Sequence, residues 1–420
     1  MDDGQIDKQA AARARAYSIP LEQIDPATPE LFRDDVIWPY FERLRKEAPI
    51  HYQAEHEFGP YWSVTKYNDI VAVDSDHASF SSEPSITIAD PKEDFKLPMF
   101  IAMDPPKHDA QRKTVSPIVA GPNLQALEPI IRERAGKILD ELPIGEEFDW
   151  VDKVSIELTT MTLATLFDFP WEDRRKLTRW SDVATSGPNT GIFTSPETAE
   201  DERRAELFEC VDYFMRLWNE RVNAPPKGDL ISMLAHGEST RNMDRMEYLG
   251  NLILLIVGGN DTTRNSISGS VLALNQFPDE YRKLKADPAA MIPSMVSETI
   301  RWQTPLAHMR RNATRDVEIG GKTIRKGEKV IMWYVSGNRD EEVIERPNDY
   351  WIDRPNVRRH LSFGFGIHRC VGNRLAELQL KIIWEEILKR FPTIEVVGEP
   401  RRVLSSFVKG YETLPVIIPA

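Results

Sequence analysis

A glycine-rich stretch near the C-terminus, Leu361–Gly372, most constrains what this chain can form. It reads Leu-Ser-Phe-Gly-Phe-Gly-Ile-His-Arg-Cys-Val-Gly, and its glycines Gly364 and Gly366 permit backbone angles that are closed to other residues. We expect a tight loop and then a helix that opens at Cys370, because apolar residues recur at three- and four-residue steps until Pro392. A cysteine at a helix N-terminus has its thiolate stabilised by the helix dipole, and a thiolate binds metals.

The neighbouring residues argue against two other interpretations of this stretch. Cys370 could be a buried structural thiol, as most lone cysteines are, but glycine, histidine and arginine crowd around this one sulfur. Gly364 and Gly366 could be half of a dinucleotide-binding fingerprint, but Arg369 stands in the place of the third glycine and no βαβ pattern surrounds it. We therefore favour a metal-binding cysteine.

The segment Phe363–Gly372 resembles, without a gap, the cysteine-loop signature of the cytochromes P-450, the haem-thiolate monooxygenases. The resemblance implies that Cys370 is the proximal ligand of the iron, and that Phe363 and Gly372 belong to the loop that binds the haem. It also implies a mainly α fold with small β regions, in which haem b lies between a long distal helix and the helix after the cysteine.

Length and composition predict one large domain, because no linker, low-complexity tract or repeat divides the 420 residues. Residues 1–30 are polar and predict an arm, either helical or mobile, before a haem-thiolate monooxygenase domain at residues 31–420. The formal net charge of -13 argues against nucleic acid as a partner, since phosphates call for a basic surface.

Cysteine usage and hydropathy predict a cytoplasmic protein. Cys210 and Cys370 lie far apart in the sequence, which makes a disulfide framework implausible and fits a reducing compartment. The N-terminus is charged where a signal peptide needs an apolar core. The longest apolar run, Leu252–Val257, is far shorter than the roughly 20 residues of a membrane span, so we expect none.

Hydrophobic periodicity gives a coarse map of the remaining chain. Helices are predicted at 38–46, 125–180 and 200–222, and short strands at 51–53, 61–65 and after Pro305. Residues 80–99 show no clear period and predict a long loop. The Gly/Pro-rich residues 185–193 predict another, which the family resemblance places in a mobile lid over the substrate entrance.

Four basic residues are candidates for binding the haem propionates. Asp104-Pro-Pro marks a helix start, and His108 and Arg112 then fall on one face of that helix. Such a pair alone is more often a solvated surface, but the family resemblance gives it to the propionates, which guanidinium and imidazole recognise well. The resemblance implies the same role for Arg311 and His368.

A long apolar run, 249–274, has helical length but carries Gly258-Gly-Asn-Asp-Thr-Thr-Arg-Asn265 in its middle. Mid-helix glycine costs about 1 kcal/mol relative to alanine, and a carboxylate is costly to bury without a task. The alternative is that Thr262 bonds its own helix and Asp261 faces solvent. The stretch resembles the family's distal helix, where Gly258 makes room for dioxygen and the Asp261–Thr262 pair delivers the protons that oxygen cleavage requires.

Glu298 and Arg301 place opposite charges three residues apart, which any surface helix can do. Their order before the cysteine loop resembles the Glu-x-x-Arg of the family, and Arg354 stands where the third member of that network is expected. We expect a structural triad, in which loss of one partner leaves an uncompensated buried charge and costs about 3–5 kcal/mol.

The family resemblance implies a monooxygenase that uses O2 and two electrons from NAD(P)H. No flavin or iron–sulfur motif is present in the sequence, so a separate ferredoxin with its reductase is implied as the electron donor. An acidic ferredoxin would suit a basic patch on this acidic chain. The residues of that patch are Lys113, Arg358, Arg359, Arg369 and Arg374.

The substrate is expected to be small and hydrophobic. The segments Gly258–Asn265 and His308–Arg311 resemble the bacterial branch that hydroxylates the terminal carbon of medium-chain alkanes and fatty acids. Enzymes acting on sterols, branched lipids or terpenoids are the alternative, since a similar segment occurs there. Candidate pocket residues are Phe95, Leu254, Val257, Leu306 and Phe407.

Two further alternatives belong to other classes, a haem-thiolate ligand sensor and a peroxide-driven peroxygenase. A sensor needs no proton delivery, and a peroxygenase needs no ferredoxin. The Asp261–Thr262 pair counts against both.

Overall fold

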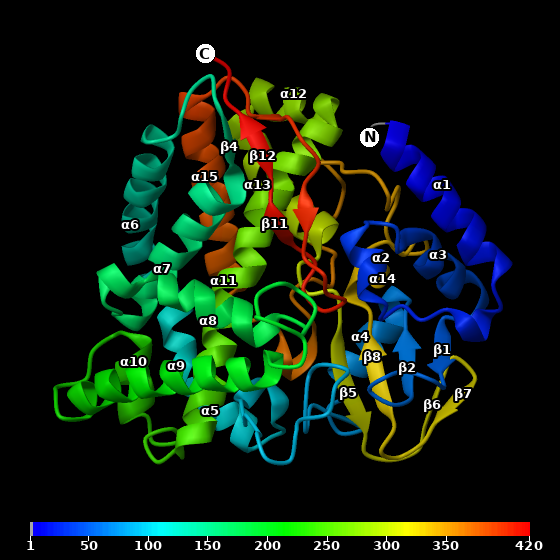
Figure 1. Ribbon diagram of the computed structural model, residues 1–420, viewed down its shortest axis with the longest axis horizontal. Coiled ribbons are helices and arrows are strands. Elements are labelled where there is room, and N and C mark those ends of the chain that lie inside the picture. Colours follow the sequence, from blue (N-terminus) through cyan, green and yellow to red (C-terminus); the bar gives the residue numbers. More distant parts are fainter. Residues whose placement is uncertain (1–2) are drawn as a thin grey trace. The chain divides into compact units, whose positions relative to one another are not determined.

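The computed structural model describes residues 3–420, which form two compact units (Figure 1). The first unit comprises Met1–Pro91, Leu272–Cys370 and Arg401–Gly410, and the second comprises Lys92–Val271, Val371–Pro400 and Tyr411–Ala420. Helices dominate and the sheets are small, which confirms the predicted mainly α fold with small β regions. The helix α11, Arg245–Gln276, begins in the second unit and ends in the first.

The first unit contains a five-stranded sheet in the order β1-β2-β8-β5-β3 (Figure 1). Only the β2–β8 pair is parallel, with Trp62 opposite Val330. A separate β6–β7 hairpin follows β5 along the chain. The strands are β1 Ile50–Gln53, β2 Tyr61–Val64, β3 Phe80–Ser81, β5 Met309–Ala313, β6 Val317–Ile319, β7 Lys322–Ile324, β8 Lys329–Met332 and β10 Arg401–Arg402.

Four helices of the first unit, at residues 3–18, 29–33, 38–47 and 334–337, contribute to a core that includes Phe41 and Trp333, whose ring centroids lie 5.3 Å apart. Ala12 and Ala16 belong to the same core, so part of the predicted arm is a packed helix, while a domain boundary at residue 30 stays a prediction. The helices are α1 Asp3–Ser18, α2 Pro29–Arg33, α3 Trp38–Glu47, α4 Tyr67–Ser75, α12 Pro278–Ala286, α13 Pro288–Gln303 and α14 Tyr334–Gly337.

The second unit is mostly helical and includes a three-stranded sheet in the order β4-β12-β9. The helices predicted within residues 125–180 are present, but the short strand β4, which was not predicted, lies between them. Its helices are α5 Lys107–Val115, α6 Gly121–Asp140, the π-helix Val151–Ile156, α7 Glu157–Phe167, α8 Arg175–Thr185, α9 Ala199–Val222, α10 Leu230–His236 and α15 Asn373–Arg390. Its strands are β4 Glu147–Asp149, β9 Glu395–Val396, β11 Tyr411–Thr413 and β12 Pro415–Ile417.

Two predicted helix starts were misplaced, one by three residues and one by two. The helix α15 begins at Asn373 rather than at Cys370, because a turn of 3₁₀ helix at Gly366–His368 and the turn after it come first. The helix α5 begins at Lys107, and its N-cap position is occupied by Pro106 rather than by Asp104. In both places the glycines or prolines that mark a start lie outside the helix itself.

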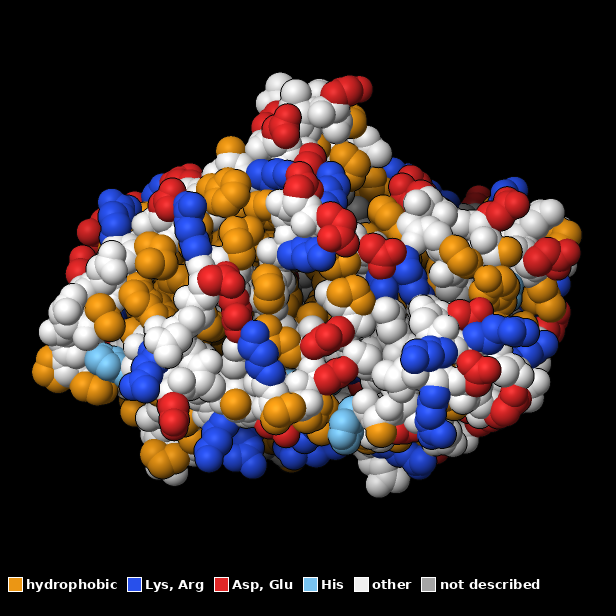
Figure 2. All heavy atoms as spheres, turned by 90° about the horizontal axis from the view of Figure 1, so that it is seen from below, with side chains coloured by type: hydrophobic (Ala, Val, Ile, Leu, Met, Phe, Trp, Pro, Cys, Tyr) orange, Lys and Arg blue, Asp and Glu red, His pale blue; other side chains and the backbone are white. Residues whose placement is uncertain are grey.

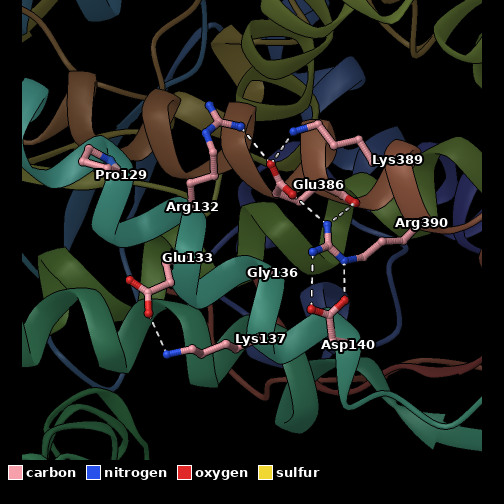
Figure 3. A pocket seen from close by; sticks show the side chains of 9 residues that line it. All are labelled: Pro129, Arg132, Glu133, Gly136, Lys137, Asp140, Glu386, Lys389 and Arg390. Carbon is pink, nitrogen blue, oxygen red and sulfur yellow. Dashed lines mark hydrogen bonds and ion pairs between the residues drawn. The ribbon is translucent and has the colours of Figure 1, made fainter.

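A shallow groove lies between α6 and α15 (Figure 3). At its centre the Glu386 carboxylate pairs with Arg132 at 3.0 Å and with Lys389 and Arg390 at 2.6 Å each. Burial disfavours the charged carboxylate, but these three donors outweigh it and lower the pKa of Glu386 to about 2. These ion pairs hold the two helices together. Because charged side chains line the groove, it does not suit an apolar substrate.

The face drawn in Figure 2 mixes basic, acidic and apolar side chains. Among residues 3–420, no helix combines the length and apolarity that crossing a bilayer requires.

Candidate functional site

The cysteine loop of the first unit ends on an exposed residue, Cys370. Its backbone N–H donates to the Phe363 carbonyl at 2.8 Å, which closes the loop as the glycine pattern predicted. Gly364 and Gly366 have φ of +66° and +64°, in the left-handed region that favours glycine. A Cβ at Gly366 would also collide with the backbone oxygen of Asp74, so glycine is required there for space as well.

Two side chains from elsewhere in the first unit accept hydrogen bonds from the loop's backbone. Asp74 Oδ2 accepts from the Phe365 N–H at 2.8 Å, and Asn338 Oδ1 accepts from the Leu361 N–H at 2.6 Å. The Asn338 amide also donates to Ser362 Oγ at 2.9 Å. Sequence reasoning missed both residues, because neither belongs to a motif with a recognisable spacing.

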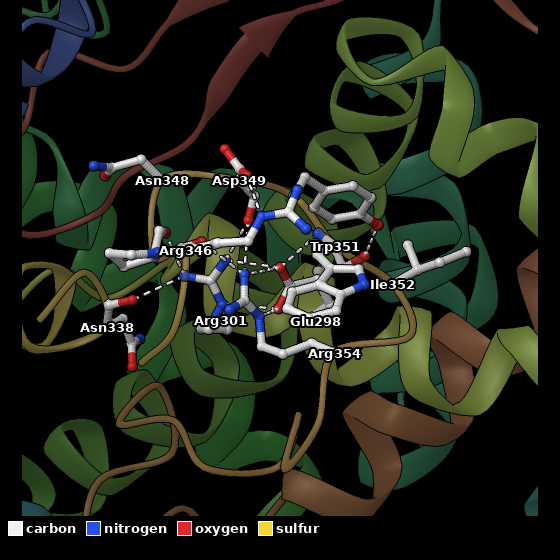
Figure 4. A network of polar contacts seen from close by, with 12 residues as sticks. Glu298, Arg301, Asn338, Arg346, Asn348, Asp349, Trp351, Ile352 and Arg354 are labelled. Atoms are coloured by element: carbon white, nitrogen blue, oxygen red, sulfur yellow. Dashed lines mark hydrogen bonds and ion pairs between the residues drawn. The ribbon is translucent and has the colours of Figure 1, made fainter. Parts of the chain in front are cut away.

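The triad residues Glu298, Arg301 and Arg354 form one buried network (Figure 4). Glu298 pairs with Arg301 at 2.7 Å and with Arg354 at 3.1 Å, and it accepts the Trp351 N–H at 2.8 Å. Arg301 Nη1 also donates to the Asn338 carbonyl at 2.8 Å. The network therefore reaches the cysteine loop through Asn338, whose side chain holds Leu361 and Ser362.

Arg311 lies on β5 and points its guanidinium at Asp74, with Nη2 2.7 Å from Oδ1. The neighbouring Arg310 instead pairs with Asp90 at 2.8 Å. His368 occupies the end of the 3₁₀ turn before Cys370 and is half-buried.

On α11, within the second unit, Asp261 is fully buried and surrounded by donors. Ser181 and Thr185 donate hydroxyls to its carboxylate at 2.9 and 3.3 Å, and Arg264 Nη2 lies 3.2 Å from it. Burial raises the pKa of the Asp261 carboxyl, and the Arg264 charge opposes that effect. Arg264 also pairs with Asp182 at 2.6 Å, and the Asp182 side chain is 29% exposed. The alternative in which Asp261 faces solvent is therefore wrong. The Arg264–Asp182 pair connects the buried carboxylate to a partly exposed side chain.

Thr262 and Gly258 lie one turn apart on α11, and the Thr262 hydroxyl donates to the Gly258 carbonyl at 3.1 Å. Gly258 is exposed in the middle of this helix, and a Cβ added to it would meet nothing within 4 Å. Leu254 and Val257, next to Gly258 on the helix, are half-buried. One stripe of α11 thus presents an open, mainly apolar face.

The other candidates are divided between the units. In the second unit His108 is buried on α5, which lowers its pKa, and Arg112 is half-buried one turn on. Phe95 in the same unit packs edge-on against Phe208 of α9, with centroids 5.5 Å apart. In the first unit Leu306 and Phe407 come together, since the Ala307 N–H donates to the Phe407 carbonyl at 2.8 Å. The five basic patch residues named from the sequence are all exposed.

Comparison with known proteins decides the family. The family described as Cytochrome P-450 matches residues 192–408. Linalool 8-monooxygenase of Pseudomonas putida is 34% identical over 410 residues, covering 95% of this chain and 99% of that protein. The chain belongs to the cytochrome P-450 family.

Two further similarities place this P-450 among bacterial members. Methyl-branched lipid omega-hydroxylase of Mycobacterium tuberculosis is 30% identical over 397 residues, which are 91% of each chain. The solved structure of CYP153D17 from Sphingomonas sp. PAMC 26605 is 51% identical, with a TM-score of 0.88 over 94% of this chain and 99% of that one.

As a member of this family the P-450 is a haem-thiolate monooxygenase that uses haem b, O2 and electrons passed from NAD(P)H through redox partners. The described residues fit that cofactor. The first unit offers an exposed thiol at the end of a glycine loop, which is the donor that ferric iron takes in this class. The second unit offers the stripe at Gly258, where an added Cβ would meet nothing within 4 Å.

Proposed function

We propose that this P-450 hydroxylates the terminal carbon of an aliphatic chain, a medium-chain alkane or fatty acid. The observation that carries the proposal is the α11 stripe, where apolar Leu254 and Val257 lie next to the open position Gly258 and to Thr262. The names of two similar proteins, an omega-hydroxylase of methyl-branched lipids and a linalool 8-monooxygenase, support an extended hydrophobic substrate. A terpenoid, sterol or branched lipid is the alternative.

Cys370 is proposed as the iron ligand, in the loop bounded by Phe363 and Gly372. The bound haem supplies the chemistry that activates O2 and inserts one oxygen atom into a C–H bond. His108, Arg112, Arg311 and His368 are proposed to bind its two propionates, since each offers a donor for a carboxylate. Leu306, Phe407 and Phe95 are proposed to contact the substrate.

The proton path that we propose runs from solvent to Asp261 and on to Thr262. The Arg264 guanidinium keeps its protons and holds the buried Asp261 carboxylate in place at 3.2 Å, and it also pairs with the partly exposed Asp182. Because burial raises the pKa of Asp261, this carboxyl takes up a proton more readily than an exposed one and returns it. Thr262 lies next to it in the sequence, and its hydroxyl, which donates to the Gly258 carbonyl, would turn to pass a proton toward the open position at Gly258.

A ferredoxin is proposed as the direct electron donor. Lys113, Arg358, Arg359, Arg369 and Arg374 are exposed, and their charge would attract an acidic protein to an enzyme whose net charge is -13. Such attraction weakens as salt is added. Normal turnover with hydrogen peroxide alone, and none with ferredoxin and its reductase, would favour a peroxygenase instead.

The substrate class is tested by titrating the haem-loaded enzyme with matched sets of n-alkanes, fatty acids, terpene alcohols and steroids. Displacement of iron-bound water, seen as a spectral shift, reports binding, and product analysis reports the carbon attacked. Tight binding of one n-alkane or fatty-acid length, with terminal alcohol as the main product, supports the proposal. Saturating shifts only with steroids or terpenes, or attack inside the chain, would overturn it.

A further inference from the structure

Asp74, in the last turn of α4, is a carboxylate with three separate donors, and no motif predicts it. Arg311 Nη2 donates to Oδ1 at 2.7 Å, while the Tyr334 hydroxyl at 2.7 Å and the Phe365 N–H at 2.8 Å donate to Oδ2. Asp74 and Arg311 are each only 3% exposed. The carboxylate therefore joins the arginine of β5, the first residue of α14 and the cysteine loop at one buried point.

The two glycines of the cysteine loop leave space for Asp74. A Cβ at Gly366 would collide with the Asp74 backbone oxygen, and one at Gly364 would come within 3.3 Å of Oδ2 and of the Tyr334 hydroxyl. The two glycines thus make room for the end of α4 in addition to supplying left-handed angles. Phe365, between them, turns its backbone N–H toward the carboxylate.

Three donors of this kind call for an ionised carboxylate. Burial and the Asp74 charge raise the pKa of Tyr334 well above its ordinary value, so its hydroxyl remains a donor. Arg311 is always charged, and the Asp74 carboxylate supplies a counter-charge to its buried guanidinium. An amide in place of Asp74 would turn N–H groups toward donors and could not neutralise Arg311.

We propose that Asp74 is a positioning residue of the haem-thiolate site: its carboxylate fixes the Cys370 loop through Phe365 and fixes the Arg311 guanidinium at the same time. The inference rests on the proposed roles of Cys370 and Arg311, and it goes beyond them by naming what holds both in place. Asp74 acts through these residues and does not itself touch the iron.

The haem-loaded enzyme and its Asp74→Asn variant provide the test. Three quantities are measured: the fraction of reduced carbon monoxide adduct with the red-shifted thiolate band, the rate of haem transfer to excess apomyoglobin, and the ferric/ferrous potential. We expect Asp74→Asn to lose part of the thiolate band and to release haem about tenfold faster, as for loss of a hydrogen bond to a buried charge. We also expect a more positive potential, because Arg311 loses its counter-charge.

Two control variants separate this role from general stability. Asp90→Asn breaks the ion pair of the adjacent Arg310, and Tyr334→Phe removes one donor without changing charge. Both should keep the thiolate band and stay within about twofold of the wild-type rate of haem release, since neither removes an acceptor of the loop's backbone.

Each outcome decides between the roles. An Asp74→Asn enzyme that melts earlier but keeps the wild-type potential, haem release and thiolate band would overturn the proposal. If Asp74→Asn yields no folded holoenzyme, the test uses Asp74→Glu, which displaces the same charge by one methylene. Wild-type values of all three quantities in Asp74→Glu would equally overturn the proposal. A wild-type enzyme without the thiolate band would instead refute the role of Cys370, so the two failures are distinguishable.

Discussion

The cysteine loop and the distal helix α11 are held by different means. In the loop, side chains from other segments accept backbone N–H groups, those of Phe365 and Leu361. In α11 the backbone is satisfied within the helix, and the outside partners bind side chains, as Thr159 does with Asn260 at 2.8 Å. Irregular backbone in a protein interior needs acceptors from elsewhere, whereas a helix supplies its own.

Because of this difference, substitutions around the loop should change stability, whereas substitutions in α11 should change the reaction. Removing a support of the loop leaves buried N–H groups or charges without partners, so folding and haem retention should suffer together. Removing a polar side chain of α11 leaves the helix intact, so the enzyme should fold and bind substrate while its chemistry changes. The following predictions are ordered by their expected effect on the haem site, and each tests one side of this contrast.

The largest effect is expected for Glu298→Gln. The substitution leaves Arg301 and Arg354 buried without a counter-charge, and the free energy of unfolding of the haem-loaded enzyme should fall by about 3–5 kcal/mol in urea titrations. Arg346→Gln, which breaks the exposed pair with Asp349 and the contact with the Trp351 ring beside the same network, should cost less than about 1 kcal/mol. Similar losses in the two variants would contradict a buried network.

A smaller loss is expected for Asn338→Ala. The Leu361 N–H loses its acceptor and Ser362 loses a donor, which should cost about 1–3 kcal/mol of unfolding free energy and weaken the thiolate band. The control is Asn348→Ala, because the nearby Asn348 contacts Arg339 only at 3.4 Å. A change in stability without any change in the spectrum would show that Asn338 does not support the loop.

Thr262→Ala should leave stability and substrate affinity near those of the wild type and still impair the reaction. Product formation should fall about 100-fold, the lower end of what a positioned proton donor contributes, with electrons from NADH recovered as hydrogen peroxide. Ser266→Ala removes another hydroxyl that bonds this helix, one turn on, and should keep the wild-type amount of product per NADH. Undiminished product per NADH in Thr262→Ala would refute the proton path.

The smallest effect is expected for Glu386→Gln, in the groove between α6 and α15. The folded pKa of Glu386, about 2, lies below its ordinary value of 4.5, so its contribution to stability is present above 4.5 and lost as the pH falls toward 2. The variant should therefore show a flatter loss of stability across that window, with the thiolate band unchanged. An unaltered pH dependence would mean that Glu386 is not held ionised by its three partners.

The sequence predicted those parts of the site that lie within short motifs. The loop Phe363–Gly372, the helix with Gly258–Asn265 and the network of Glu298, Arg301 and Arg354 were all named from residue spacing and family resemblance. Their geometry is now described, while their roles toward haem and protons stay predictions. The glycine turn was predictable because few residues adopt its angles.

The supporting residues were not predictable from the sequence. Asp74 and Phe365 are 291 residues apart, and an acid at the end of a short apolar helix is common. Ser181, which holds Asp261, likewise carries no motif. The fold brings such partners together from distant parts of the sequence, so only the three-dimensional structure identifies them.

The most direct test of this account is the spectrum of the reduced carbon monoxide adduct, recorded for the purified haem-loaded enzyme and for Cys370→Ser. If Cys370 binds the iron, the wild type shows the red-shifted band of thiolate ligation and the variant loses it completely. A wild type without that band, or a Cys370→Ser variant that keeps it, would contradict the assignment of sulfur 370 to the iron.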